Sequence, residues 1–266
     1  MPAVGAAFLR YGGHTPCLAL AHNGAAPSLV LDAGTGITQL APLLGGAAFS
    51  GAIVLTHLHW DHVQGLPFCH SADHPEARVA FRLPAQEDGA EAASVLARAM
   101  SPPHFPIGPH DLHGDWDFGS LDPSEYELEG FRILAREVPH KGGRTFGYRV
   151  SDDRSTLTYI PDHCPTRLGP GDDGFGARHP AALELARDAD LLIHDAQLLP
   201  EEIAEADFGH AVADYAAGLA HAAGAHQVLL FHHKPDRTDD QLDALAARFA
   251  GDPLVDVAVD AAVFDL

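Results

Sequence analysis

The segment Thr56–His62 constrains this chain more than any other part of the sequence, because it packs three histidines and an aspartate into one short run. It directly follows the apolar run Ala52-Ile53-Val54-Leu55, which is typical of a buried strand. In an extended segment His57 and His59 point to the same side and can reach one cation, whereas Asp61 and His62 begin the next turn. Imidazole and carboxylate ligands favour zinc or another first-row divalent ion. The pattern indicates two neighbouring metals at a strand end, and the alternative is a solvated turn that is rich in histidine.

Length and composition favour one large globular domain. The 266 residues are 46% hydrophobic, which supplies a substantial core, and we expect a single domain over residues 1–266. Cys17, Cys69 and Cys164 form no C-x-x-C pair and are expected to be buried thiols in a reducing compartment. Met1–Arg10 lacks a signal-peptide pattern, and no apolar run is long enough to span a membrane. We therefore expect a soluble, cytoplasmic protein that does not act on membranes and that could form a homodimer.

The charge balance narrows the class of substrate. Lys plus Arg number 16 and Asp plus Glu number 37, so the net charge is 16 − 37 = −21. Such a surface repels a phosphate backbone, whose binding depends on clustered basic residues. We predict a small anionic substrate and consider long nucleic acid an unlikely partner.

The pattern of apolar runs and turns predicts strands early in the chain and helices late. We expect early strands at Cys17–His22, Ser28–Asp32 and Ala52–Thr56, with a helix at Ile37–Leu44. The middle should form strands at Arg78–Leu83, Tyr126–Leu128, Arg132–Val138, Thr145–Val150 and Leu157–Ile160, with a helix at Glu91–Met100. The last third should alternate between helices at Ala181–Arg187, Ala211–Ala222 and Asp239–Phe249 and strands at Leu191–His194 and Val228–Phe231. Ser101–Gly119 reads as a long loop that could wall the active site. This order fits an α/β protein with two sheets covered by helices.

The motif His57-x-His59-x-Asp61-His62 after a buried strand resembles the signature of the metallo-β-lactamase superfamily. The longer run Leu55–Phe68 resembles a phosphodiesterase-like branch that is related to tRNase Z and to the cyclic phosphodiesterase of phosphonate breakdown. Further similar segments are Arg10–Cys17, Asp32–Gly36, Pro139–Gly143, Phe146–Arg149, Tyr159–His163, Leu191–Gln197, Gly209-His210 and Leu229–His233. The resemblance implies an αββα sandwich, with two mixed β-sheets flanked by helices.

The resemblance also implies a ligand set for two divalent metals, most simply Zn²⁺, with Mn²⁺ or Fe²⁺ as alternatives. One metal would be bound by His57, His59 and His140, and the other by Asp61, His62 and His232, with Asp162 bridging the two. The residues themselves agree, because His140, Asp162 and His232 each close a predicted strand. His233 competes with His232 for the last position, and we favour His232 because it directly follows the apolar strand.

Several residues are candidates for supporting roles. Asp195 and Asp32 each end an apolar strand and could orient a ligand imidazole, although Asp32 could equally serve only the turn before Gly34. The resemblance implies that His210 is a non-ligand histidine that faces the substrate phosphate, and with Asp61 it is our candidate catalytic residue. The alternative for His210 is a helix cap. Lys141 and Arg144 could contact an anionic substrate, or could lie in a solvated loop.

The sequence departs from the pattern of this branch at positions that bear on substrate rather than on metal. His14 stands where Asn is usual, and Ala211-Val212 follows His210 where Ser-Thr is common in tRNase Z-like sequences. The chain shows no long insertion rich in Gly, Pro and Lys of the kind that tRNase Z uses to grip tRNA. The segment before Arg10 leaves little room for the usual first strand.

Three functions remain open at this point. The first is a binuclear hydrolase that cleaves a small phosphodiester, cyclic nucleotides included, through a hydroxide that bridges the metals. The second uses the same site on a lactone, thioester or β-lactam. The third is a non-catalytic accessory protein that keeps the metals for structure. The matches around Phe146–Tyr148 and His210 favour the first.

Overall fold

The computed structural model describes residues 5–266, so residues 1–4 of the Met1–Arg10 segment lie outside the described part of the chain. These residues form two compact units. The first-sheet unit is Thr15–Asp122, and the second-sheet unit is Pro123–Leu266 together with the residues up to His14. The single domain over residues 1–266 stays a prediction.

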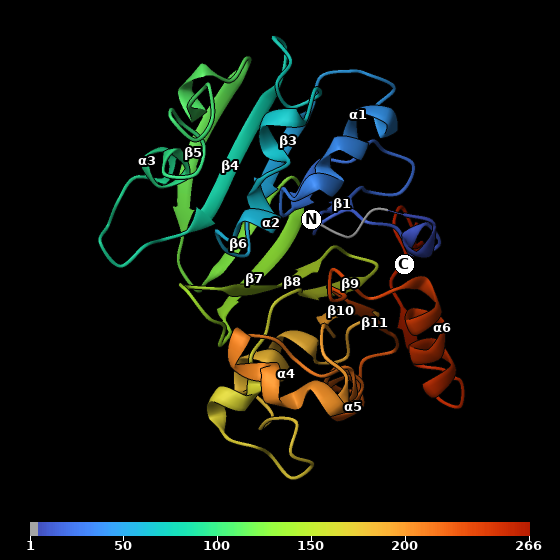
Figure 1. The fold of residues 1–266 in the computed structure, drawn as a ribbon. Helices are drawn as coiled ribbons and strands as arrows, with labels where there is room; N and C mark the ends of the chain where they lie inside the picture. Colours follow the sequence, from blue (N-terminus) through green and yellow to red (C-terminus); the bar gives the residue numbers. More distant parts are fainter. Residues whose placement is uncertain (1–4) are drawn as a thin grey trace. The chain divides into compact units, whose positions relative to one another are not determined.

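The first-sheet unit contains a five-stranded mixed sheet, coloured blue to green in Figure 1. Its strands lie in chain order: β1 (Leu18–Leu20), β2 (Leu29–Leu31), β3 (Ser50–Val54), β4 (Arg78–Pro84) and β5 (Asp115–Leu121). Only β1 and β2 pair in antiparallel fashion, and the other pairs are parallel. β2, which lies between β1 and β3, is buried at every position, as expected for an interior strand whose sheet is covered on both faces.

Short helices cover this sheet. They are the α-helices α1 (Leu40–Leu43), α2 (Trp60–Val63) and α3 (Ala92–Ala97), and the 3₁₀ helices η2 (Thr35–Gln39), η3 (Leu66–Phe68) and η4 (Pro109–Asp111). Side chains such as Ile53 and Phe81 of the strands pack with Ile37, Leu40 and Leu96 of the helices in one core. The unit therefore has a hydrophobic core of its own.

The second-sheet unit contains a seven-stranded mixed sheet in the order β12-β11-β10-β9-β8-β7-β6. The strands are β6 (Glu125–Leu128), β7 (Phe131–Glu137), β8 (Phe146–Ser151), β9 (Thr156–Ile160), β10 (Leu191–Asp195), β11 (Val228–Phe231) and β12 (Val255–Val257). The pairs from β9 to β12 are parallel, and those from β6 to β9 are antiparallel.

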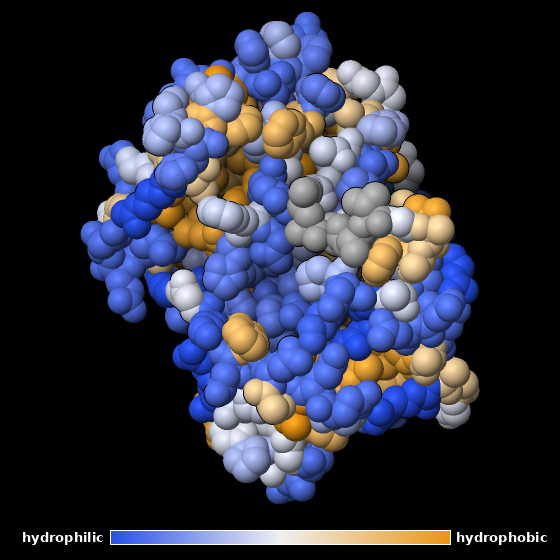
Figure 2. Space-filling view, viewed as in Figure 1, coloured by the Kyte–Doolittle hydropathy of each residue, from blue (hydrophilic) through white to orange (hydrophobic). Residues whose placement is uncertain are grey.

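The helices of this unit are α4 (Pro180–Ala186), α5 (Ala213–Ala223), α6 (Asp239–Arg248), and the 3₁₀ helices η1 (Ala6–Phe8), η5 (Pro165–Leu168) and η6 (Pro200–Phe208). Figure 1 shows α4 and α5 close together, and Leu185 and Leu219 from these helices share a core with Ile160 and Leu192 of the sheet. The visible face of this unit is mainly hydrophilic (Figure 2), in keeping with the acidic composition.

Several polar residues that the sequence singled out lie at one edge of the second sheet. β9, β10 and β11 are parallel neighbours, so their carboxyl ends meet at the same edge, where Asp162, Asp195 and His232 follow or end them. β7 is antiparallel to β8, which is antiparallel to β9, so β7 also ends at this edge, three residues before His140.

The predicted fold class, two mixed sheets flanked by helices, is confirmed, but some element predictions are wrong. Ser101–Gly119 is not one loop, because its end forms the edge strand β5, which pairs with β4 along its whole length. The Gly and Asp residues of that segment are uncommon in strands and therefore did not predict one. The expected helix Ile37–Leu44 is a 3₁₀ turn followed by the four-residue α1. Among residues 5–266 no helix is long and apolar enough to cross a membrane.

Candidate metal centre

The Thr56–His62 motif begins two residues after Val54, the last residue of β3. Leu55 still donates a backbone hydrogen bond to Arg82 O at 2.9 Å, and α2 then starts at Trp60. The segment after β2 holds this turn in place, because Ala33 N donates a hydrogen bond to His62 O at 2.8 Å. Gly34 lies so close to the Asp61 carbonyl that a Cβ atom would clash with it. The backbone between β2 and η2 thus holds the backbone of the motif.

Asp32 orients two of the motif's imidazoles. Its fully buried carboxylate accepts a hydrogen bond from His62 Nδ1 at 2.8 Å and from the Thr56 hydroxyl at 2.9 Å. The Thr56 oxygen in turn lies 3.1 Å from His57 Nδ1 and can accept its hydrogen. With Nδ1 of both rings bound in this way, the remaining Nε2 atoms carry the lone pairs that a metal needs. Asp32 is therefore a positioning residue, and Thr56 is one that the sequence pattern did not reveal.

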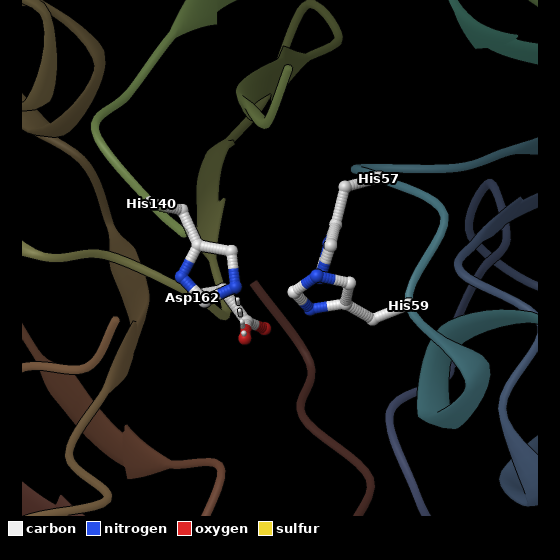
Figure 3. Close-up of side chains that lie close together, drawn as sticks. All are labelled: His57, His59, His140 and Asp162. Atoms are coloured by element: carbon white, nitrogen blue, oxygen red, sulfur yellow. Dashed lines mark ion pairs between the residues drawn. The ribbon is translucent and has the colours of Figure 1, made fainter. Parts of the chain in front are cut away.

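The remaining ligand candidates of this unit gather at the same turn. The ring centroids of His57 and His59, drawn in Figure 3, lie 4.5 Å apart, and those of His57 and His62 lie 4.2 Å apart. His62 Nε2 lies 3.5 Å from Asp61 Oδ2. A lone pair on the ring nitrogen and a carboxylate oxygen repel each other at this distance unless a cation or a proton lies between them.

In the second-sheet unit, three histidines surround Asp162. We call the four residues His140, Asp162, His210 and His232 the His140 cluster. His140 Nδ1 donates to the Gly209 carbonyl oxygen at 2.6 Å, so the neutral ring carries its lone pair on Nε2. That Nε2 lies 3.5 Å from Asp162 Oδ1, as the dashed line in Figure 3 marks. Burial lowers the pKa of His140 from its ordinary value, which favours the neutral ring that a metal requires.

Asp162 presents its second oxygen to another histidine. Asp162 Oδ2 lies 3.5 Å from His232 Nε2, and the other ring nitrogen of His232 lies 2.9 Å from the side-chain amide of Gln197. Asp162, His210 and His232 offer ligand atoms that all lie within 4.8 Å of one another. Each oxygen of the Asp162 carboxylate thus faces one imidazole nitrogen. Gln197, two residues after Asp195, is a further contact that the sequence pattern missed.

Asp195 contacts His210 rather than any of the predicted ligand histidines. Its Oδ2 lies 3.0 Å from His210 Nδ1 and also accepts the backbone hydrogen bond of His163 at 2.9 Å. The ring of His210 is stacked on that of His232, with centroids 5.1 Å apart and an interplanar angle of 20°. His210 lies three residues before the first residue of α5, since the helix begins at Ala213 with Val212 as its cap. His210 is therefore not the cap residue of α5.

His163 and His194 are two further buried histidines, next to Asp195. His194 Nδ1 donates to the Asp195 carbonyl oxygen at 2.7 Å, and its Nε2 lies 3.0 Å from His163 Nδ1. Burial lowers the pKa of both rings, that of His163 strongly. His233 is half-buried, and its pKa is lowered by desolvation to about 4. The lowered pKa values favour the neutral form of these rings.

Of the two basic candidates, Lys141 is exposed and Arg144 is half-buried. Arg144 pairs with Glu137 at 3.2 Å and lies over the ring of Phe146. The Lys141 ammonium lies 5.2 Å from the centre of the Phe208 ring. Arg144 is thus engaged within the protein, whereas Lys141 faces an exposed aromatic residue.

The donor sets fit divalent metal ions. Each unit contributes neutral imidazoles whose second nitrogen is held by an acceptor, together with a carboxylate that faces them. Two mixed sheets with such residues at their strand ends define the metal-dependent hydrolases of the metallo-β-lactamase class. A family model described as the beta-lactamase superfamily domain matches residues 28–233, and the chain belongs to this family.

Curated relatives carry the name ribonuclease Z. That of Salinibacter ruber is 29% identical over 262 residues, covering 82% of this chain and 79% of the relative. That of Haloarcula marismortui is 29% identical over 273 residues, covering 88% and 82%. Together with the family match, these relatives make the chain a metal-dependent hydrolase.

Solved structures share the fold. A diphosphatase from the PhnP family superposes with a TM-score of 0.65 at 19% identity, covering 95% of this chain and 85% of that one. The short form of human tRNase Z superposes with a TM-score of 0.63 at 19% identity, covering 99% and 96%. At this level of identity they show the fold alone.

Proposed function

We propose that the protein is a binuclear, zinc-dependent phosphodiesterase for small phosphodiesters, cyclic nucleotides included. His57, His59 and His140 would hold one ion, Asp61, His62 and His232 the other, and Asp162 would bridge them. When bound, such ions supply an activated water and neutralise charge on the phosphate oxygens. The observation that carries the proposal is His210, a histidine tied to Asp195 beside the Asp162 carboxylate.

His210 has the features of a general acid. With Nδ1 donating to Asp195, Nε2 is the nitrogen that can face the substrate, and it is the imidazolium form of the ring that carries a proton on Nε2 to transfer to a leaving alkoxide. The side chain is only 13% exposed, so its position is set by the protein and not by solvent. A lactone or β-lactam also expels an oxygen or nitrogen that an acid protonates, so His210 supports hydrolysis over a structural metal site, and the relatives named ribonuclease Z favour a phosphodiester over a carbonyl substrate.

The relatives' name raises a second candidate, cleavage of an RNA phosphodiester. In favour of it stands the similarity to two proteins named ribonuclease Z. Against it stand the net charge of −21 and the presence of just two lysines in the sequence, because RNA binding relies on contacts from Lys and Arg. We therefore favour the small substrate.

A single screen tests the proposal. The purified protein, loaded with Zn²⁺ or Mn²⁺, is assayed against cyclic and linear phosphodiesters, a lactone, a thioester and a precursor tRNA, and its metal content is measured. We expect close to two equivalents of metal and the highest kcat/KM on a small diester. His232→Ala should lose metal as well as activity.

Other outcomes would contradict the proposal in distinct ways. Faster cleavage of the precursor tRNA would assign the RNA function, and faster hydrolysis of the lactone or thioester would assign carbonyl chemistry. Full activity in His57→Ala would remove the metal site itself from the reaction.

A further inference from the structure

Phe208 and Lys141 form an exposed pair at the edge of the His140 cluster. Phe208 ends η6 and is separated from His210 by a single glycine, and Lys141 directly follows His140. The two segments are in contact, because the Gly209 carbonyl oxygen accepts the hydrogen bond from His140 Nδ1 at 2.6 Å. A Cβ atom on Gly209 would lie 2.8 Å from the His140 ring and 3.1 Å from Lys141 Cβ. The pair is therefore fixed in place relative to the cluster.

The exposure of Phe208 is unusual for its surroundings. Its ring is 67% exposed, whereas the Phe and Tyr side chains of the β-strands β8 and β9 in this unit are fully buried. The inner side of η6 packs against the protein through Ala206, which is buried, and Ile203, which is half-buried. Phe208 belongs to the same helix but does not take part in this packing. An aromatic ring that stays in solvent beside a reactive histidine is suited to contact another planar group.

Lys141 adds a cation to this ring. It is one of only two lysines in the sequence, and among residues 5–266 its ammonium forms no ion pair with a carboxylate. The other, Lys234, pairs with Glu205 at 2.8 Å and with Glu202 at 3.5 Å. In a chain of net charge −21, a cation with three hydrogen-bond donors to offer is a place for an anionic oxygen.

We propose that Phe208 and Lys141 form a substrate subsite that selects phosphodiesters bearing a nucleobase. The base stacks on the face of Phe208 that Lys141 does not cover, and the lysine binds a non-bridging oxygen of the phosphate. This inference rests on the proposed phosphodiesterase function and names its substrate class. Stacking of a base on an aromatic side chain tolerates any base, so the subsite selects nucleotides without selecting their sequence.

The test measures binding to the metal-loaded protein by calorimetry, with adenosine 5′-monophosphate and ribose 5-phosphate as the two probes. They share the phosphate and the sugar and differ by the base. We expect the wild type to bind the nucleotide about tenfold more tightly than the sugar phosphate, as stacking of one base contributes. Phe208→Leu should lose that preference and leave the affinity for ribose 5-phosphate unchanged. Lys141→Gln should weaken both probes and keep the preference.

Two variants serve as matched controls. Leu168→Ala removes an exposed apolar side chain elsewhere in the unit, and Arg132→Gln removes a cation at the start of β7, at the opposite end of that strand from His140. Both should bind the two probes as the wild type does. Because Phe208 and Lys141 are exposed, their variants should keep the thermal unfolding midpoint of the wild type.

The outcomes separate this inference from the proposed function. Equal affinity of the wild type for both probes, or an equal loss of both in Phe208→Leu, would overturn the subsite even if diesters are hydrolysed. Failure to hydrolyse any diester, with the base preference intact, would instead overturn the proposed function and leave a nucleotide-binding site.

Discussion

Asp32 illustrates how one buried carboxylate can position several imidazoles. It has a positive φ of 61° at the end of β2, a conformation that Asp and Asn adopt more readily than other non-glycine residues. This backbone turn directs the carboxylate back toward Thr56 and His62. A residue at a strand end can thus position side chains that lie 24 and 30 positions further along the chain, those of Thr56 and His62.

We predict that Asp32→Asn weakens metal binding about 10- to 100-fold while the protein stays folded. Asn keeps the shape and tolerates the left-handed backbone, but its amide NH₂ cannot accept the hydrogen bonds of both Thr56 and His62 Nδ1 as the carboxylate does. Competition with a chromophoric chelator measures the affinity. Asp73→Asn is the control, since Asp73 pairs with His113 at 3.0 Å on the surface of the same unit, and it should not change the affinity.

His210 should matter for the leaving group and not for the metals. His210→Ala is expected to keep both ions and to lower turnover of an alkyl diester by about 10²- to 10⁴-fold, the usual range for a general acid. A nitrophenolate leaves without protonation, so a nitrophenyl diester should lose little. Steady-state kinetics on both substrates and metal analysis of the variant give the comparison. Equal losses on the two substrates would show that His210 positions the phosphate, and no loss on either would remove it from the reaction.

At the scale of elements, the turn between η6 and α5 holds Phe208 and His210 and also contacts His140. Gly209 has a positive φ of 116°, which ends η6 and places Phe208 and His210 on either side of the turn. Its carbonyl oxygen fixes the tautomer of His140. The turn therefore couples the end of a helix to the orientation of the His140 ring.

We predict that Gly209→Ala lowers both stability and metal affinity. The new Cβ would meet the His140 ring at 2.8 Å, and alanine adopts this φ at a cost of roughly 1 kcal/mol or more. Gly224→Ala is the control: Gly224 also has a positive φ, of 72°, but its Cβ would meet only the Asp188 side chain. Chemical denaturation and metal titration should show a stability loss in both variants and an affinity loss in Gly209→Ala alone. Unchanged affinity in Gly209→Ala would mean that the turn does not position His140.

The buried ring of His194 at the end of β10 should make stability depend on pH. Its pKa is lowered in the folded protein by burial, so the unfolded chain, with a pKa of about 6.5, binds the proton more tightly. The stability is fully present above about pH 6.5 and falls below it, by up to about 1.4 kcal/mol per pH unit for this one group. Urea unfolding of chelator-treated protein should show a shallower pH slope in His194→Gln. His226→Gln, which alters an exposed histidine near Asp190, should keep the slope of the wild type.

The sequence predicted the metal motif and the strand ends better than it predicted the edges of the sheets. His140, Asp162 and His232 could be anticipated because each follows an apolar strand, and a strand end is a local property of the sequence. β5 could not, since Asp115, Asp117 and Gly119 disfavour a strand although Trp116 and Phe118 favour one, and its conformation depends on pairing with β4. Thr56 and Gln197 were missed for a related reason: their role is to contact a histidine, and such contacts leave no periodic pattern in the sequence.

At the scale of the whole molecule, charge governs which substrates approach. The net charge of −21 becomes −17 with two divalent ions bound, so a polyanion is repelled at long range whatever the local site offers. A small diester carries one charge and meets this repulsion only weakly. Because electrostatic effects are screened by salt, the salt dependence of the rate reports how many phosphates the protein contacts.

We predict that kcat/KM for a small diester changes less than about threefold between 50 and 200 mM salt, because a small diester has a single phosphate to contact. A substrate held through several Lys and Arg contacts would lose affinity steeply over that range, with a logarithmic slope of about −0.7 per contact for a single strand. Rates on the small diester and on a precursor tRNA, measured across this range at constant free metal, give the two slopes. On the acidic surface the RNA should react slowly at low salt and gain from screening, because repulsion rather than attraction is being reduced. A steep fall in the RNA rate with salt would show a basic contact surface strong enough to outweigh the net charge, and would identify RNA as the substrate that the protein is built to bind.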